Sequence, residues 1–447
     1  MHNIVPQLLL YGDMPKESIL MELCDIFAQA ELGVERRDIL ITRIHREIKR
    51  ILEVATNFGF DKNLWHNYLT FLLITNENPF SITCEKVGAN DGSVNYFAKG
   101  DFKAFKALFD YDFSGIEEKL GIDCFTRINQ YKAISKKELM YNKNVSEKVQ
   151  ALSEQLETAK DEDEFFHYVT EFYKAFGVGM FGLNKAFRIL SGERAGDIEF
   201  LPINNMEKVM LDDLIGYELQ KKKLVENTKA FVEGRKANNV LLFGDSGTGK
   251  STSIKAIVNE FYPDGLRMVE IYKHQFKDLS AVIAQLKNRN YKFIIYMDDL
   301  SFEEFEIEYK FLKAVIEGGV ETKPDNILIY ATSNRRHLIK ETWKDRNDVE
   351  QSEGMHRSDT MEEKLSLVNR FGVTINYSKP THKEYYEIVL GLAHRMNLPY
   401  SNEELVAEAN KWELFHGGIS GRTAQQFINH LAGKNGGLSE PSKEIPD

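Results

Sequence analysis

One short stretch constrains the fold of this chain more than any other. Residues 244–251 read Gly-Asp-Ser-Gly-Thr-Gly-Lys-Ser, the pattern of a phosphate-binding P-loop. The apolar run Val240–Phe243 precedes the loop, and a helical pattern over Thr252–Phe261 follows it. This is the strand–loop–helix order that the motif requires, so the sequence predicts a parallel α/β sheet around the loop.

The residue types in the loop suit the binding of phosphate. Its glycines, Gly244, Gly247 and Gly249, let successive backbone N–H groups converge on phosphate oxygens, and the amino end of the helix adds its positive dipole. Lys250 is expected to neutralise the β- and γ-phosphates, and the Ser251 hydroxyl to bind Mg²⁺. We therefore predict that ATP or GTP binds here, with further contacts from the other loop positions, Asp245, Ser246, Thr248 and Thr252.

Two later apolar strands end in polar residues. Phe293–Met297 leads into Asp298, expected to hold Mg²⁺ through water, and Asp299, which lies where an attacking water can be polarised. Ile327–Ala331 leads towards Asn334, whose side chain can reach the γ-phosphate and that water. Taken alone, Asn334 is better explained as a turn residue that bonds its own backbone. We also expect the strand that intervenes in the sequence, Arg267–Ile271, to separate the P-loop strand from the strand of the two acids.

The rest of the chain divides by pattern. Residues 1–195 are expected to be mostly helical and residues 196–210 to form a linker. Residues 211–380 are predicted to be the α/β domain, 381–434 a helical lid and 435–447 a flexible tail. The predicted strands are Asn239–Phe243, Arg267–Ile271, Lys292–Met297, Asn326–Ala331 and Val373–Tyr377, and the lid helices His382–Met396, Glu403–Lys411 and Gly421–Leu431.

Three patterns in the first region have competing interpretations. Arg36–Ala55 has an apolar stripe typical of an amphipathic helix, and we interpret its basic face, Arg43–Arg50, as solvated rather than as a nucleic-acid surface. The acids Asp161–Glu164 are expected to begin a helix. Gly177–Gly182 matches the dinucleotide pattern GxGxxG, but it follows a helical pattern instead of a strand, so we predict a glycine-rich turn.

Composition narrows the class of protein. The 57 Lys and Arg residues against 68 Asp and Glu residues give a net charge of −11, which argues against a broadly basic nucleic-acid binder. The three cysteines are far apart, without a CxxC pair, which predicts neither a zinc site nor a disulfide framework and fits a reducing cytoplasm. We find no apolar stretch long enough to span a membrane and no basic, apolar leader that would indicate secretion.

These motifs, in this order, resemble the AAA+ ATPases over roughly residues 205–435. The P-loop and Asp298–Asp299 resemble the Walker elements of that family, and Asn334 resembles its sensor 1 residue. Asp213–Gly216 resembles the segment whose backbone touches adenine, which assigns Ile215 and Gly216 to nucleotide binding. Two arginines complete the resemblance: Arg370 at the arginine-finger position and Arg422 at sensor 2.

More narrowly, the segments MDDLSFEE, EGGVE, YATSNRR and NRFG resemble the bacterial AAA+ group known only as domain of unknown function 815. In that group a helical amino-terminal region of this size precedes the ATPase module. The resemblance implies an α/β P-loop fold of AAA+ type with a helical lid, but no cellular role.

The sequence departs from the common AAA+ pattern at two places. Asp299 stands where the catalytic residue is usually Glu, one methylene longer, so turnover is expected to be slow. The segment Tyr272–Leu279 lacks the glycine of an aromatic–hydrophobic–glycine pore loop, which leaves the threading of a polypeptide unsupported. The polar stretch from Arg335 to Lys364 is interpreted as a surface excursion, with a substrate-contacting insertion as the alternative.

The expected activity is hydrolysis of ATP at an interface between subunits of a homo-oligomer, a closed or an open ring. Lys250, Ser251 and Asp298 would hold MgATP, and Asp299 and Asn334 would orient water. The resemblance implies that Arg422 reports the γ-phosphate to the lid and that Arg370 reaches the phosphate of the neighbouring subunit. The alternative for Arg370 is a local ion pair with Glu362 or Glu363.

Three classes of function stay open. The first is the remodelling of an unknown protein partner held by the helical region. The second is a nucleic-acid loader or processing factor that uses Arg43–Arg50 or Lys221–Lys223, which the acidic balance disfavours. The third is an ATP-dependent switch or scaffold with little turnover, suggested by Asp299. ATP is favoured over GTP because the sequence has no NKxD motif.

Overall fold

The computed structural model describes residues 1–134, 143–192, 194, 196–204, 206–302, 308–317, 324–335, 338 and 367–434. These residues form two compact units, one of Met1–Asn184 with Pro202–Asn205, the other of Lys185–Leu201 with Met206–Asp447. Some predictions fall outside the described residues: the tail 435–447, nearly all of the polar stretch 335–364, and both carboxylates offered as alternative partners of Arg370.

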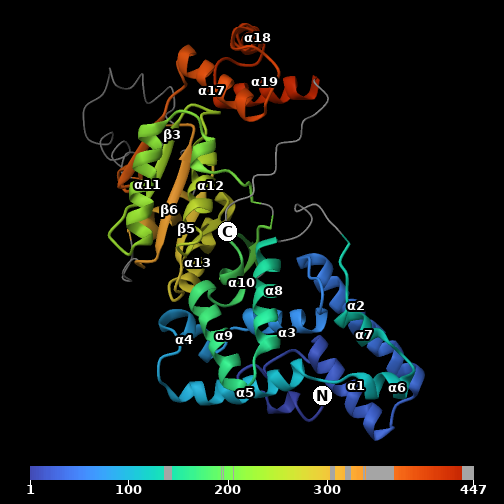
Figure 1. Cartoon of the computed structure of the whole chain (residues 1–447). Helices are drawn as coiled ribbons and strands as arrows, with labels where there is room; N and C mark the ends of the chain where they lie inside the picture. The colour runs from blue at the N-terminus through green and yellow to red at the C-terminus, as the bar shows by residue number, and fades with distance from the viewer. Residues whose placement is uncertain are drawn as a thin grey trace. The chain divides into compact units, whose positions relative to one another are not determined.

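The first unit is built from helices that pack around one apolar core (Figure 1). A 3₁₀ turn, Val5–Gln7, precedes α1 (Ile19–Leu32), α2 (Arg37–Phe58), α3 (Leu64–Thr75), α4 (Pro79–Val87), α5 (Ser93–Phe109), α6 (Ser114–Leu120), α7 (Cys124–Asn129), α8 (Lys143–Thr158), α9 (Glu162–Phe176) and α10 (Gly179–Leu183).

The local patterns of this unit explain where its helices begin and which faces they bury. α2 buries Ile44, Ile48 and Ile51 on one stripe, because positions three and four apart share a helix face. Asp161 caps α9 by accepting hydrogen bonds from the first-turn N–H groups at 3.1 and 2.9 Å, so the predicted acidic helix start is confirmed. Gly177 ends α9, which confirms that the GxGxxG match follows a helix instead of a strand.

The second unit is organised around a seven-stranded sheet with the order β2-β1-β4-β5-β6-β3-β7. Neighbouring strands from β1 to β7 run parallel. The five predicted strands are present within one or two residues of their expected bounds. The observed strands are β1 (Ala186–Ser191), β2 (Ile198–Pro202), β3 (Val240–Gly244), β4 (Leu266–Glu270), β5 (Lys292–Met297), β6 (Ile327–Ser333) and β7 (Val373–Tyr377).

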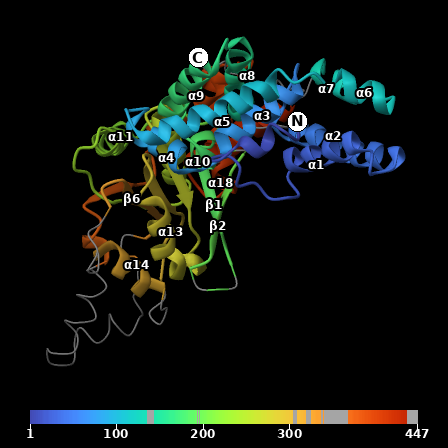
Figure 2. The same ribbon diagram turned by 90° about the horizontal axis from the view of Figure 1, so that it is seen from below.

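The structure corrects the prediction for the segment before this sheet. Residues 186–195 were expected in the helical region and 196–210 in a linker, yet β1 and β2 extend the sheet at one edge (Figure 2). β1 pairs with β4, where Ala186 lies opposite Met268. The linker prediction is wrong over β2, because glycines and polar residues around Gly192 and Gly196 hide two short strands that form only by pairing within the sheet.

A strand does separate the P-loop strand β3 from β5, but it is β6 and not the expected strand β4. β4, which lies between β3 and β5 in the sequence, packs on the far side of β5. This order matters because it places the end of β6 between the P-loop and the two acids.

Helices cover the sheet and form the lid (Figure 1). α17, α18 and α19 share their own apolar core, with side chains such as Phe427 and Ile428 buried in it. Capping boxes begin α17 at Thr381 and α18 at Ser401. Alongside the 3₁₀ turns Leu211–Asp213 and Lys273–Asp278, the helices are α11 (Glu218–Val232), α12 (Lys250–Phe261), α13 (Leu279–Leu286), α14 (Glu308–Glu317), α17 (His382–Arg395), α18 (Asn402–Phe415) and α19 (Gly421–Lys434).

The predicted α/β P-loop fold with a helical lid and a helical amino-terminal region is confirmed. Among the described residues, none of the helices is both long and apolar enough to cross a membrane.

Candidate nucleotide site

The strand order brings the predicted site residues to one edge of the sheet. β3 pairs with β6, placing Phe243 opposite Ser333, and β6 pairs with β5, placing Ala331 opposite Met297. The loops that leave these strands therefore start side by side, since parallel strands all end at the same edge. The P-loop, the two acids and Asn334 meet there.

The P-loop has the backbone that its glycines permit. Gly244, Gly247 and Gly249 have φ values of 131°, 76° and 89°, a region that other residues rarely adopt. A Cβ on Gly244 would lie 2.3 Å from the Tyr377 carbonyl oxygen. Gly249, the residue that precedes α12, has no side chain to cap the helix. The first N–H groups of α12 therefore receive no hydrogen bond acceptor from a capping side chain. Such a helix start suits an anion.

Lys250 lies buried within the loop and holds it together. Its Nζ donates to the carbonyl oxygens of Gly244 and Asp245 at 3.1 and 2.6 Å and to Asn334 Oδ1 at 3.0 Å. Burial lowers the pKa of Lys250, although the nearby carboxylates of Asp299 and Asp298 act in the opposite direction. The ammonium group is thus held where the phosphates of a nucleotide would lie.

Asp298 is fixed by three hydroxyl groups that all donate to the same oxygen, Oδ1. Ser251 Oγ lies 2.7 Å away, Tyr296 OH 2.7 Å and Thr332 Oγ1 2.6 Å. Burial by itself would raise the pKa of Asp298, but these hydrogen bonds outweigh it and the pKa is lowered. Burial, followed by the charge of Asp298, raises the pKa of Tyr296, so this phenol stays a donor.

Asp299 adopts a left-handed backbone, with φ of 49°. Its N–H donates to Thr332 Oγ1 at 2.9 Å, and its carboxylate accepts a hydrogen bond from Asn334 Nδ2 at 2.8 Å. Asn334 therefore bridges Lys250 and Asp299. The interpretation of Asn334 as a turn residue that bonds only its own backbone does not describe these contacts.

The segment predicted to touch adenine lies between the P-loop helix and the lid. Ile215 packs against the lid core, where a Cβ on Gly391 of α17 would come within 2.5 Å of Ile215 Cδ1. Gly216, next to it, has φ of 82°. Arg395 of α17 also donates to the carbonyl oxygens of Asp212 and Asp213.

Arg422 lies at the start of α19, against the tip of the P-loop. Its N–H donates to the Gly247 carbonyl oxygen at 3.1 Å. A Cβ on Gly247 would lie 3.1 Å from both Arg422 Cβ and Ser420 Oγ. The structure thus brings the predicted sensor 2 residue to the loop through its backbone.

Arg370 is the one predicted site residue that the structure does not bring to the P-loop of its own chain. It precedes β7, whose first residue Val373 pairs with Val240, whereas Tyr377 at the far end pairs with Gly244. At about 3.3 Å per residue, these four steps separate the two ends of β7 by about 13 Å. Arg370 therefore lies at the amino end of the parallel strands, whereas its own P-loop lies at their carboxyl end.

The other predicted loop residues stabilise the loop itself. Asp245 accepts a hydrogen bond from the Lys379 N–H at 2.8 Å, and its own N–H donates to the Tyr377 carbonyl oxygen at 3.0 Å. Thr248 is buried and donates to the Asp245 carbonyl oxygen at 2.8 Å. Ser246 is exposed and Thr252 is partly buried in the first turn of α12.

Sequence reasoning missed Tyr296 and Thr332. A signal for both was present, because each lies two residues before a predicted site residue, Asp298 and Asn334, and alternate residues of a strand share a face. It was not used, since Tyr and Thr are common in buried strands for reasons of packing.

The oxygen donors fit Mg²⁺. Ser251 Oγ and the carboxylate of Asp298 offer hard oxygen atoms at one place, and Mg²⁺ is usually held by one or two protein oxygens with phosphates and water. Within the described parts of the chain, no group of three or more His, Cys, Asp or Glu side chains forms a cage for a metal.

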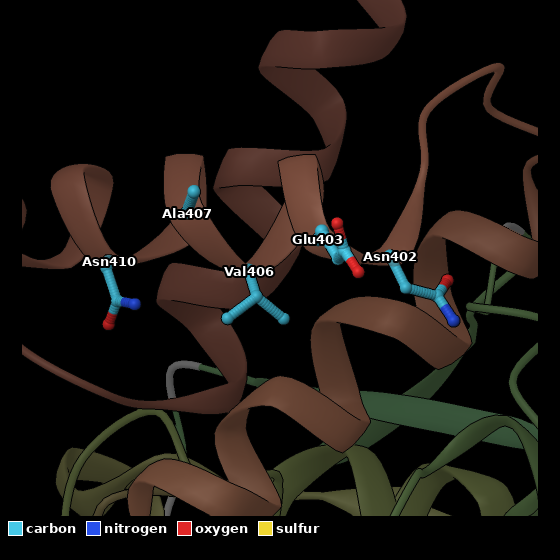
Figure 3. Close-up of a pocket in the computed structure, with 5 residues that line it drawn as sticks. All are labelled: Asn402, Glu403, Val406, Ala407 and Asn410. Carbon is cyan, nitrogen blue, oxygen red and sulfur yellow. The ribbon is translucent and has the colours of Figure 1, made fainter.

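A separate pocket lies on α18 (Figure 3). It is lined by Asn402, Glu403, Val406, Ala407 and Asn410, all from this one helix. The Asn410 side chain already accepts a hydrogen bond from Tyr386 OH at 2.6 Å. None of these residues belongs to the predicted nucleotide site.

Comparison with known proteins gives a family but no activity. The family described as Protein of unknown function (DUF815) matches residues 184–435, and none of the curated proteins matches. The solved AAA domain of FIGL-1 in complex with ADP is 20% identical, covering 51% of this chain and 74% of that chain, with a TM-score of 0.36. Two variants of RuvB from Thermotoga maritima are each 18% identical. Each comparison covers 52% of this chain and 74% of the RuvB chain, with a TM-score of 0.32. At such TM-scores no conclusion about this chain rests on these structures.

The match to the family model spans more than half of the chain, and it begins at the strand β1 that extends the sheet. The P-loop after β3, the acids after β5 and the helical lid after β7 follow the order of the motifs in the sequence resemblance, and the strand order β4-β5-β6-β3-β7 brings these motifs together. The protein belongs to the DUF815 family, and its second unit has an α/β P-loop fold with a helical lid.

Proposed function

We propose that the second unit binds ATP with Mg²⁺ and hydrolyses it at an interface between subunits of a homo-oligomer, and that this activity remodels a protein partner. The observation that carries the proposal is the convergence at one edge of the sheet. There Ser251 contacts Asp298 at 2.7 Å, and Asn334 joins Lys250 to Asp299 at 3.0 and 2.8 Å.

Each residue has a role that its position supports. The N–H groups of the P-loop and Lys250 would neutralise the phosphates, and Ser251 and Asp298 would hold Mg²⁺. When bound, Mg²⁺ neutralises charge that develops on the phosphate oxygens. Asp299 would accept a proton from the attacking water. Asn334, which bonds both Asp299 and Lys250, would fix the position of these two side chains relative to each other.

The lysine contacts also define a change that binding must make. Nζ of Lys250 is occupied by the two carbonyl oxygens of Gly244 and Asp245 and by Asn334. A phosphate would compete for this ammonium group with uncharged acceptors, and its negative charge adds a coulombic attraction that carbonyl and amide oxygens lack. Binding of the nucleotide is therefore expected to release Lys250 from at least one of these partners.

The position of Arg370 supports a site shared between subunits. Arg370 precedes β7, whose first residue, Val373, already lies about 13 Å from the strand end that contacts its own P-loop. If Arg370 stabilises charge on a phosphate, that phosphate is therefore bound by another copy of the chain. This is our reason for proposing a homo-oligomer, in a closed or an open ring.

A nucleic-acid function is less well supported. The basic face of α2 is neutralised within its own unit, since Arg43 lies 2.7 Å from Asp25 and 3.1 Å from Glu22. In the second unit, Lys221 donates to the Leu214 carbonyl oxygen at 2.8 Å and pairs with Glu218 at 2.7 Å. Phosphate contacts would have to break these bonds.

The aspartate at position 299 supports a second candidate function, an ATP-dependent switch with little turnover. Aspartate is one methylene shorter than the usual glutamate, and its carboxylate is engaged by Asn334 at 2.8 Å. A protein that binds ATP, changes its assembly and releases ADP slowly would have this arrangement.

The decisive experiment measures ATPase activity per subunit against protein concentration for the wild type and for Arg370→Ala. We expect activity to rise with concentration and to fall by about 10³-fold in the variant, the effect of losing an arginine supplied in trans, while ATP binding persists. Arg235→Ala is the matched control, because Arg235 is an exposed arginine of the same unit that pairs with Glu233. ATP binding without turnover at any concentration would leave the switch as the function.

A further inference from the structure

One oxygen of the Asp298 carboxylate accepts several hydrogen bonds. Three hydroxyl groups donate to Oδ1, from α12, β5 and β6. The other oxygen, Oδ2, takes no part in these three bonds. A carboxylate held this way has one oxygen committed to the protein and a defined direction for the second, which is what a group that binds a metal-bound water needs.

The three donors are not equivalent. Ser251 lies in the first turn of α12 and is itself a proposed ligand of Mg²⁺, so its bond to Asp298 must be exchanged or shared when the metal binds. Thr332 and Tyr296 are buried, with 2% and 1% of their surfaces exposed, and have no role towards a nucleotide. Their bonds can persist throughout a reaction cycle.

Thr332 acts on both acids at once. Its hydroxyl donates to Asp298 Oδ1 at 2.6 Å and accepts the N–H of Asp299 at 2.9 Å. The second bond holds Asp299 in its left-handed backbone, a conformation that costs free energy and persists where surrounding contacts enforce it. The direction of the Asp299 side chain towards Asn334 therefore depends on a hydroxyl of the neighbouring strand.

Tyr296 supplies the second permanent contact. It lies on β5, two residues before Asp298, which directly follows the strand, and the phenol reaches Oδ1 at 2.7 Å. In a buried site, a tyrosine hydroxyl needs such a partner, because leaving it unpaired is costly.

We propose that Thr332 and Tyr296 are positioning residues that orient Asp298 towards Mg²⁺, and that Thr332 also sets the geometry of Asp299 as the base. This inference rests on the proposed function and adds two residues to it. Neither residue touches the substrate. Their effect is to keep the two consecutive acids at a fixed mutual orientation, one towards the metal and one towards the water.

The chain offers a matched set of variants. Thr332→Val removes the hydroxyl at nearly constant volume, Thr332→Ser keeps it, and Tyr296→Phe removes the phenol oxygen. Thr228→Val and Tyr330→Phe are the controls, because Thr228 and Tyr330 form a buried hydroxyl pair at 2.7 Å in the same unit that does not include either acid. Tyr330 also lies directly opposite Tyr296 in the sheet.

Three readouts are compared across these variants: kcat, the ratio of the ATP dissociation constants without and with Mg²⁺, and amide hydrogen exchange at Asp299 without nucleotide. For Thr332→Val we expect kcat and the Mg²⁺-dependent gain in affinity to fall by about 10–100-fold, the usual effect of a lost outer-sphere partner, with metal-free ATP binding unchanged. Asp299 should also lose its exchange protection. Tyr296→Phe should lose the gain in affinity but keep that protection, and Thr332→Ser should restore all three.

The inference is overturned if Thr332→Val resembles Thr228→Val in all three readouts, or if Thr332→Ser is as impaired as Thr332→Val, which would indicate packing instead of the hydroxyl. Should Thr332→Val not fold, Tyr296→Phe and Thr332→Ser still test it through the metal dependence. A wild-type protein that binds no ATP overturns the proposed function and this inference together. Normal wild-type binding with unaffected variants overturns the inference alone.

Discussion

Each unit contains a cluster of charged side chains, and the two clusters differ in the kind of partner that the charged groups bind. On α2 of the first unit, Arg43 pairs with Asp25 and Glu22, and the fully buried Glu47 is held by Arg46 and Arg50. At the P-loop of the second unit, Lys250 lies close to two carboxylates, yet its described hydrogen bonds go to carbonyl and amide oxygens.

The difference teaches how to separate a structural cluster from a binding site. In the first unit each charge is neutralised by a direct partner, so the cluster stabilises the fold and has little left to offer a ligand. In the second unit the acids are satisfied by neutral hydroxyl and amide donors, and the cation by neutral acceptors. The charged side chains of this cluster therefore stay available to interact with a charged ligand.

The largest effect is expected from Lys250→Ala. Removing the buried ammonium group should reduce kcat by at least about 10²–10³-fold, because a preorganised charge in a partly buried site is lost. The fold should remain, since burial lowers the pKa of Lys250 and so its charged form costs stability. ATPase assays beside thermal unfolding check both parts, and a variant with normal kcat would remove the P-loop from the mechanism.

Glu47→Ala should give the reverse result. Glu47 is fully buried, and its carboxylate receives Arg46 Nε at 3.0 Å and Arg50 Nη1 at 2.5 Å. Its removal should lower the free energy of unfolding by about 1–3 kcal/mol, because two charged hydrogen bonds and the packing of a buried side chain are lost, while the guanidinium groups of Arg46 and Arg50, 58% and 38% exposed, regain water.

Chemical denaturation measures this loss, and ATP affinity of the folded variant should match the wild type. A large change in ATP affinity with intact stability would contradict the separation of roles between the two clusters.

Gly391→Ala tests the contact between the lid and the predicted adenine segment. The added Cβ would lie 2.5 Å from Ile215 Cδ1, the free end of that side chain, so the Ile215 side chain must turn away. We expect ATP affinity to fall by about tenfold, measured by calorimetry.

The control is Gly433→Ala in α19, where a Cβ meets open space. That substitution should stabilise the helix by about 0.5–1 kcal/mol and leave affinity unchanged. Equal affinities for the two variants would show that Ile215 does not line the nucleotide site.

The smallest effect concerns pH. The pKa of Asp298 is lowered in the folded protein, so the unfolded chain binds more protons as the pH falls through the ordinary aspartate range. The stability that Asp298 contributes is therefore present above its ordinary pKa of 3.8 and is lost as the pH drops below it.

Asp298→Asn should flatten this part of the acid unfolding curve without nucleotide, as followed by circular dichroism. An acid limb as steep as in the wild type would place the titrating group elsewhere.

The sequence by itself determined which residues follow the strands at the candidate site, and it determined most of the sheet. The P-loop, Asp298, Asp299 and Asn334 were predictable because each lies in a local pattern, an apolar strand followed by a polar residue of the right type. The same local logic predicted α2 and the capped start of α9. These features depend on neighbours in the chain and on the periodicity of a helix or a strand.

Only the tertiary structure decided which residues meet across strands. β1 and β2 form by pairing at the sheet edge, β6 lies between the P-loop and the acids, and Thr332 and Tyr296 converge on Asp298. It also placed Arg370 at the opposite edge from its own P-loop. Strand order and cross-strand contacts are set by packing between segments far apart in sequence, and no local propensity encodes them.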